Sequence, residues 1–177
     1  MLKDRIRTFA FGIVFGLFAI IVQATLFYSV FQGKIDVNLV FGLLIWLGFF
    51  KSNPEGVLLS FILAWLQGAV SGALSGVFLF AGMSLYVLCW ILRARFAPVT
   101  GLGRFGFALA MGIFYKLVLV VSLELFVGGA FIRAQSLGYM LLEVLLNAIL
   151  ALLVFALFSR LKGFLDLIPE QVKPRRH

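Results

Sequence analysis

The chain has 177 residues, of which 63% are hydrophobic and 12% are charged, and its formal net charge is +8. Soluble domains are close to half apolar and a quarter charged, and a globule of this size has too little interior for so much apolar surface. The composition therefore excludes a soluble fold and requires lipid as solvent. The apolar runs are continuous rather than alternating with polar residues, which favours helices over a membrane β-barrel.

Cysteine and histidine occur once each. Cys89 lies in an apolar stretch, where we expect a small packing residue, and a lone cysteine excludes an internal disulfide or a cysteine-based metal cluster. His177 is the last residue, which excludes a histidine metal site. We therefore expect no metal and no cofactor.

The first apolar run, residues 8–31, follows a short basic segment. It is too long for the core of a signal peptide and no small-residue cleavage site follows it, so we expect a retained helix. The second run reaches the length of a span only if it includes Ile35 and Asp36. A turn containing Pro54 and Gly56 follows it.

The third and fourth spans share one apolar stretch, residues 57–92, which is too long for a single helix. We place the break in its small-residue segment, 68–76. Two further runs complete an all-α membrane protein with a single transmembrane domain, residues 1–177, built as a bundle of about six helices. The spans are expected at about 8–31, 35–50, 57–72, 75–92, 105–127 and 137–158.

Lysine and arginine are distributed unevenly between the two sides that these spans define. Twelve lie on the side of the chain ends, and only Lys34 and Arg133 lie in the loops of the other side. Because Lys and Arg accumulate in cytoplasmic loops, we expect cytoplasmic N- and C-termini. The positive charge is thus a topology signal with some attraction to anionic membrane lipids, and we expect no nucleic-acid binding.

Polar residues within the spans are candidates for function, because ionisable groups are costly in a membrane. Lys116 and Glu124 share one face of the fifth span, while Glu143 and Asn147 lie one turn apart on the sixth. We interpret them, with Asp36, as interhelical or partner contacts in which Lys116 pairs with Glu143 or bonds to Asn147. A proton or solute pathway and a catalytic carboxylate pair are the alternatives.

Glycines recur every four residues in two places. Gly12 and Gly16 lie in the first span, and Gly68, Gly72 and Gly76 lie at the break between the third and fourth. Small residues at this spacing let helix backbones approach closely. They predict either internal packing or a docking face for another protein.

Motifs of nucleotide hydrolases, zinc proteases and serine hydrolases are all missing from the sequence. The aspartate-rich metal motif of lipid phosphate transferases is missing too. We therefore expect no enzymatic activity.

Three stretches carry a resemblance to a known family. They are residues 35–40 (IDVNLV), residues 47–56 (LGFFKSNPEG) with the apolar continuation to Ser71, and residues 146–150 (LNAIL) with the run to Leu161. In these stretches and in the order of its spans the chain resembles MreD, the small membrane protein of the bacterial rod-shape system. The family's proline before Asp36 is absent, and Gln67 and Gly68 occupy the place of a frequent aspartate, so the role of that aspartate is not carried over.

The resemblance implies a scaffold in the bacterial cytoplasmic (inner) membrane. Such a subunit binds MreC, a single-span periplasmic protein, and joins the elongation complex of the MreB filament, the RodA glycosyltransferase and a transpeptidase. Its role there is to keep peptidoglycan synthesis organised and so to maintain cell shape.

Two other classes of function remain open from the sequence. The first is the six-helix substrate-binding subunit of an energy-coupling-factor type vitamin importer, with Glu124, Glu143 and Arg133 lining a pocket, although such pockets need more convergent polar groups. The second is a membrane enzyme acting on lipid-linked substrates through Glu124 and Glu143.

Overall fold

The computed structural model describes residues 2–31, 35–51, 54–71, 75–93, 101–127 and 137–161, and all regular structure in these ranges is helical. The first helical segment is continuous but passes through one π-helical stretch, and five separate helices follow it. The elements are α1 (Leu2–Val22), η1 (Gln23–Phe27), α2 (Tyr28–Phe31), α3 (Leu39–Phe50), α4 (Pro54–Val70), α5 (Ser75–Leu92), α6 (Gly101–Val127) and α8 (Leu137–Leu161). The prediction of an all-α fold with six helices is confirmed.

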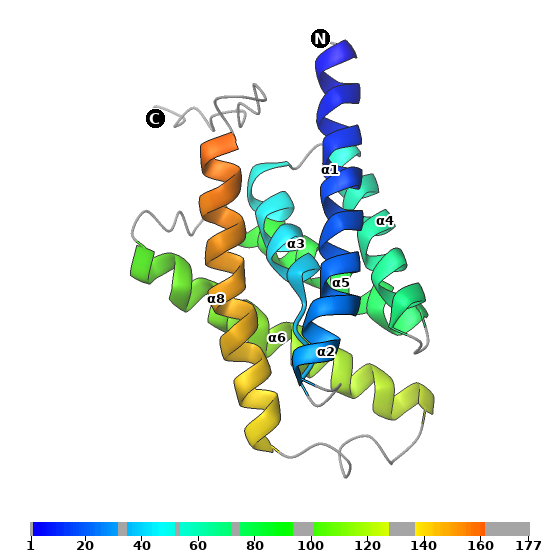
Figure 1. Cartoon of the computed structure of the whole chain (residues 1–177), viewed down its shortest axis with the longest axis vertical. Coiled ribbons are helices and arrows are strands. Elements are labelled where there is room, and N and C mark those ends of the chain that lie inside the picture. The colour runs from blue at the N-terminus through cyan, green and yellow to red at the C-terminus, as the bar shows by residue number, and fades with distance from the viewer. Residues whose placement is uncertain are drawn as a thin grey trace.

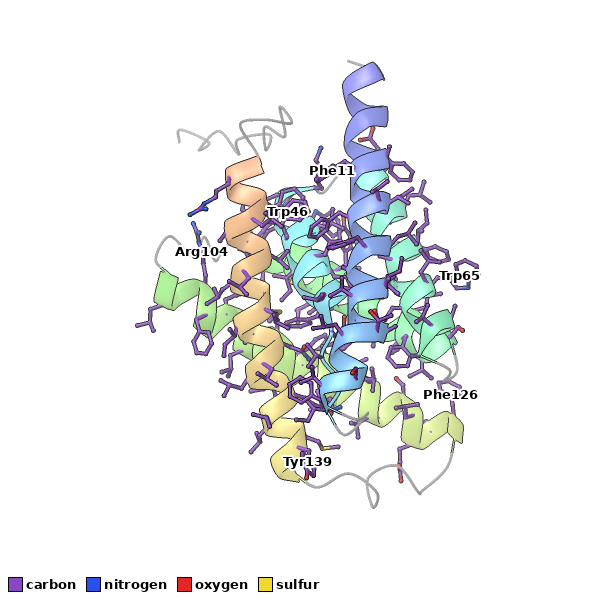
Figure 2. The ribbon with its side chains drawn as sticks, viewed as in Figure 1. Phe11, Trp46, Trp65, Arg104, Phe126 and Tyr139 are labelled. Carbon is purple, nitrogen blue, oxygen red and sulfur yellow. The ribbon has the colours of Figure 1, made fainter. Side chains whose placement is uncertain are left out.

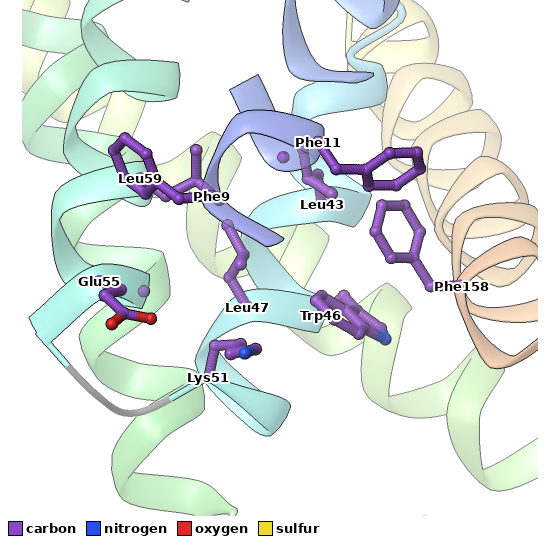
Figure 3. Close-up of a pocket in the computed structure, with 11 residues that line it drawn as sticks. Phe9, Phe11, Leu43, Trp46, Leu47, Lys51, Glu55, Leu59 and Phe158 are labelled. Carbon is purple, nitrogen blue, oxygen red and sulfur yellow. The ribbon is translucent and has the colours of Figure 1, made fainter. Parts of the chain in front are cut away.

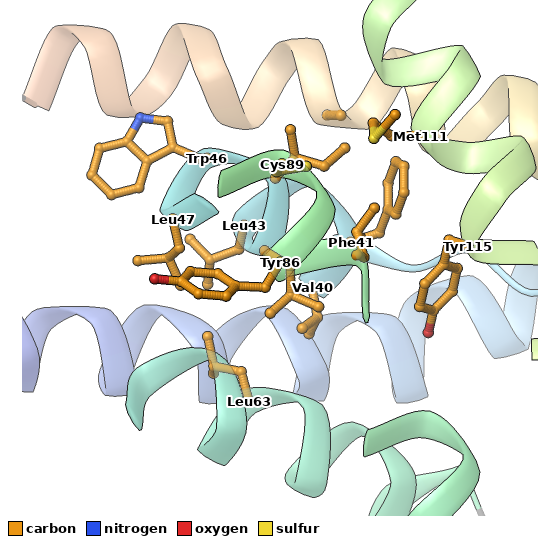
Figure 4. Close-up of a cluster of buried hydrophobic side chains, with 14 of the residues drawn as sticks. Val40, Phe41, Leu43, Trp46, Leu47, Leu63, Tyr86, Cys89, Met111 and Tyr115 are labelled. Carbon is orange, nitrogen blue, oxygen red and sulfur yellow. The ribbon is translucent and has the colours of Figure 1, made fainter. Parts of the chain in front are cut away.

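Helix α3 is the centre of the bundle, and α1, α4, α5, α6 and α8 all pack against it (Figure 1). Every residue from Val40 to Gly48 is buried, and its side chains form the middle of one apolar core (Figure 4). Around α3, neighbouring outer helices contact each other in the order α1, α4, α5, α6 and α8. The ring closes between α1 and α8 through the rings of Phe11, Phe15 and Phe158.

Helix α3 starts at Leu39, four residues later than the second predicted span. Asn38 caps it, because its side chain accepts the Phe41 N–H at 2.9 Å and so satisfies a donor of the first turn. The 12 residues of α3 rise by only about 18 Å, against a hydrocarbon core of about 30 Å. Residues 35–38 are not helical, and at the rise of an extended chain they add about 13 Å. The second crossing is therefore part extended chain and part helix.

The other boundaries differ from the expected spans by a few residues. Helix α4 begins at Pro54 because proline suits the first helical position, and it ends at Val70, inside the predicted break. Helix α6 begins at Gly101 and has 27 residues, which makes it about 40 Å long. Tilting is one way in which a helix longer than the apolar layer is accommodated, and α6 crosses behind α8 at a marked angle in Figure 1.

The outer surface of the bundle is apolar. Exposed large side chains include Trp65, Phe126 and Tyr139 (Figure 2), which are 51%, 72% and 43% exposed. Four helices are long and apolar enough to cross a membrane, whereas Leu39–Phe50 and Pro54–Val70 are apolar but shorter. Because so much exposed apolar surface is favourable only in lipid, the fold is that of a helical membrane protein.

The two glycine patterns have different structural roles. A Cβ at Gly12 or Gly16 would lie 2.4 or 2.0 Å from a leucine side chain of α4, so these glycines serve internal packing of α1 on α4. A Cβ at Gly68 would lie 2.7 Å from the Ser75 Cα, and this glycine allows the close return of α5 along α4. Gly76 has open space around it, and Gly72 lies outside the described residues.

Two glycines of α3 that the sequence analysis did not single out bring the central helix close to its neighbours. A Cβ at Gly42 would lie 2.9 Å from the Ala151 Cα of α8, and one at Gly48 would lie 2.6 Å from the Cys89 Cβ of α5. Cys89 is fully buried. It is therefore a small packing residue, as expected.

Candidate functional site

The non-helical chain before α3 creates a physical problem that the site solves. A helix satisfies its own backbone N–H and C=O groups, but an extended segment does not, and unpaired groups at membrane depth cost several kcal/mol each. Irregular backbone is tolerated there only where protein groups surround it. The backbone polar groups of residues 35–39 therefore need partners from other helices.

Helix α8 supplies two of these partners. Glu143 Oε1 accepts the backbone N–H of Asp36 at 2.9 Å, and Asn147 Oδ1 accepts the backbone N–H of Asn38 at 2.7 Å. Asn147 Nδ2 also makes a longer contact of 3.4 Å with the carbonyl oxygen of Asp36. Since Glu143 and Asn147 lie four residues apart, they present their acceptors on one face, and the extended chain runs along that face.

Asn38 links the extended chain to both α3 and α6. Its Oδ1 caps α3, and its Nδ2 donates to the hydroxyl of Tyr115 on α6 at 3.2 Å. Asn38 is 2% exposed and Tyr115 is 7% exposed. The oxygen and the nitrogen of the Asn38 side-chain amide therefore each have a hydrogen-bond partner inside the protein, as a buried polar group requires.

The π-helical stretch of the first segment provides a further acceptor. Gln23, the first residue of η1, accepts the backbone N–H of Leu39 through Oε1 at 3.2 Å. Leu39 is the first residue of α3, whose N–H has no partner within the helix. Wide π turns occur frequently where a helix serves a specific interaction, and here the interaction holds the start of α3.

Lys116 on α6 forms an ion pair with Glu143 Oε2. Their side chains are 16% and 2% exposed, so the glutamate is buried and the lysine nearly so. One carboxylate therefore uses one oxygen for the ammonium and the other for the Asp36 N–H. The predicted pairing of Lys116 with Glu143 is confirmed, and it joins α6 to α8.

We call these residues the polar cluster: Asp36, Asn38, Tyr115, Lys116, Glu143 and Asn147. All six line one small crevice between the extended chain, α6 and α8. Of the candidates from the sequence, Asp36, Lys116, Glu143 and Asn147 are thus brought together. Glu124 is not in the cluster, and its buried Oε2 has no hydrogen-bond partner in the described part of the chain.

Asn38, Tyr115 and Gln23 were missed from the sequence. An asparagine directly before an apolar run is a helix-start signal, and it would have moved the predicted start of the second helix to Leu39. Gln23 and Tyr115 carry weaker signals in the sequence: Gln23 is a polar residue inside a span, and Tyr115 is the neighbour of Lys116.

The polar groups of the cluster serve to hold the non-helical segment, α6 and α8 together. Both oxygens of Glu143 and both polar atoms of the Asn147 amide are engaged in hydrogen bonds or the ion pair. Over the ranges that the structure describes, no group of three His, Cys, Asp or Glu side chains is placed to hold a metal ion. The side chain of Asp36 is the exposed member of the cluster.

No family model, curated protein or solved structure matches this chain. The fold and the polar cluster define the class directly: a helical membrane bundle whose second crossing begins with a short non-helical segment, residues 35–38, held by side chains of neighbouring helices.

The ion pair gives a direct test of the cluster. Lys116→Met removes the ammonium group that faces the buried Glu143 carboxylate, and because breaking a buried ion pair is strongly destabilising we expect it to lower the stability by about 3–5 kcal/mol. The double variant Lys116→Met/Glu143→Gln keeps an acceptor for Asp36 without the charge, so it should recover most of that loss. Thermal unfolding of the purified protein in detergent measures both.

Glu124→Gln is the matched control, because it also neutralises a glutamate in a span but one without a partner in the described chain. Glu124→Gln should leave the midpoint temperature of thermal unfolding unchanged or raise it slightly. Equal losses in Lys116→Met and in the double variant would contradict the role assigned to the pair.

Proposed function

We propose that the protein is a non-enzymatic scaffold subunit of the bacterial rod-shape complex, similar to MreD. The observation that carries the proposal is the use of the polar cluster. Its ionisable and amide groups fasten one chain segment to two helices, whereas a catalytic site needs groups directed at a substrate. A rigid bundle with apolar outer faces suits a subunit that binds helices of other membrane proteins.

The resemblance gains support from where its stretches lie. Residues 35–40 form the extended entry and the cap of α3, and residues 146–150 contain Asn147, which binds that entry through Asn38. Two stretches that resemble the family, separated by about a hundred residues of sequence, thus meet at one hydrogen-bonded contact.

The proposed partner is an MreC-like protein with one membrane span and a periplasmic part. Through it the chain would be connected to MreB, RodA and the elongation transpeptidase. Phe61, Trp65 and Val70 are exposed on α4 and are examples of the apolar side chains that such a span would contact.

We also propose the bacterial cytoplasmic membrane as the location, with both chain ends inside. The start of α1 and the end of α8 lie at the same end of the bundle (Figure 1). Four basic residues stand at or next to helix ends on that side: Lys51, Arg93, Arg104 and Arg160. Such a collection of Lys and Arg is typical of the cytoplasmic face.

Cysteine labelling tests this orientation. Arg160 and Ser71 are exposed and lie at opposite ends of the bundle, while the native Cys89 is fully buried. In spheroplasts a membrane-impermeant maleimide should label Ser71→Cys, leave Arg160→Cys unlabelled until the membrane is permeabilised, and never label the wild type. The reverse pattern would place the basic end outside.

Depletion and copurification test the function. Loss of the protein should turn rod-shaped cells round, and the tagged chain should copurify with a single-span periplasmic protein of the MreC type. Expression of Glu124→Gln should restore the rods, while Lys116→Met should not if the fastened bundle is what the partner recognises. Normal cell width after depletion, with no such partner in the purified complex, would contradict the proposal.

The vitamin-binding alternative needs a ligand in the crevice of the polar cluster. The crevice is lined by polar groups, which is the observation in its favour, but most of those groups already bond to one another. Detection of a stoichiometric vitamin in the purified protein by mass spectrometry would favour this alternative over the scaffold.

A further inference from the structure

A groove lies at the basic end of the bundle, away from the polar cluster. It is bordered by α1, α3 and α4, with Phe158 of α8 on one side (Figure 3). Its lining is almost entirely apolar, from Phe9 and Phe11 through Leu43 and Trp46 to Leu59. Two charged residues, Lys51 and Glu55, are the exceptions among the lining residues.

The groove lies beside a seam where the ring of outer helices is closed by aromatic contacts. Phe158 of α8 stacks edge-on against Phe15 at 4.9 Å and against Phe11 at 6.2 Å, and its ring lies 4.6 Å from that of Trp46. Such ring contacts separate more easily than two helix backbones packed closely together, as α3 and α8 are at Gly42, because aromatic side chains can rotate. Rotation of these rings is the movement that would admit a slender apolar chain between α1 and α8.

The two charges near the groove are not equivalent. Glu55 has an interaction partner, whereas the ammonium group of Lys51 makes no ion pair or hydrogen bond within the described ranges. In Figure 3 the Lys51 side chain extends toward Trp46.

We propose that this groove binds an anionic phospholipid. One acyl chain occupies the apolar part beside Trp46, and the phosphate group lies at the ammonium of Lys51. The apolar lining offers nothing to a polar small molecule, since directional polar contacts are what fix such ligands. A lysine ammonium that has no partner among the described residues, next to an apolar groove at the basic end of the bundle, matches the chemistry of an acidic lipid.

Fluorescence of Trp46 provides the test, because the chain has three tryptophans and they differ in exposure. Trp65 and Trp90 are 51% and 47% exposed on the outer surface, whereas Trp46 is 7% exposed. In the variant Trp65→Phe/Trp90→Phe only Trp46 emits. The protein is placed in bilayers that contain phosphatidylglycerol or phosphatidylcholine with brominated acyl chains, which quench tryptophan on close contact.

We expect saturable quenching of Trp46, with brominated phosphatidylglycerol about fivefold more effective than brominated phosphatidylcholine, since one lysine near an anionic lipid is worth about 1 kcal/mol. Lys51→Gln should abolish this preference. Arg160→Gln is the matched control, because it removes a cation from the same end of the bundle that does not line the groove, and it should keep the preference.

Three results would overturn the proposal. No quenching by either lipid would mean that the groove admits no acyl chain. Equal quenching by both lipids would mean that the headgroup charge is not recognised. Equal effects of Lys51→Gln and Arg160→Gln would mean that anionic lipid only gathers around the basic end without occupying a site.

Discussion

Backbone hydrogen bonding of residues 35–39 is the constraint on which the rest of the structure depends. Residues 35–38 of this segment have no helical hydrogen bonds of their own, and the N–H of Leu39, the first residue of α3, has no partner within the helix. This segment lies where water is scarce as a substitute partner. Glu143, Asn147 and Gln23 accept its N–H groups. Helices α8 and η1 are therefore bound to the start of α3 by directional contacts as well as by apolar packing.

The arrangement explains why charged side chains are retained inside the bundle. Glu143 is positioned by Lys116, and as a carboxylate it is a stronger acceptor for the Asp36 N–H than a neutral side chain. The charge pair is costly to bury, but packing by apolar contacts alone gives little specificity between helices in lipid. In this bundle the polar cluster sets the position of the central helix, and the outer faces are left apolar for lipid and for partners.

Most of the fold was predictable from the sequence, because long apolar runs identify spanning helices on their own. The Lys116–Glu143 pair was predictable as well, since two costly groups in adjacent antiparallel spans have few other ways to be compensated. The start of the second crossing was not, because counting apolar residues treats Ile35 and Asp36 as helical and ignores the capping signal of Asn38. The roles of Gly42 and Gly48 also escaped prediction, since they depend on which helix is central.

Residue-resolved amide hydrogen exchange in lipid nanodiscs tests the central claim most directly. If side chains of α8 and η1 hold the extended segment, the amides of Asp36, Asn38 and Leu39 exchange as slowly as amides within α3, such as that of Ile45. If these three amides exchange at the rate of an unstructured chain while Ile45 stays protected, the segment is not fastened and the account is wrong.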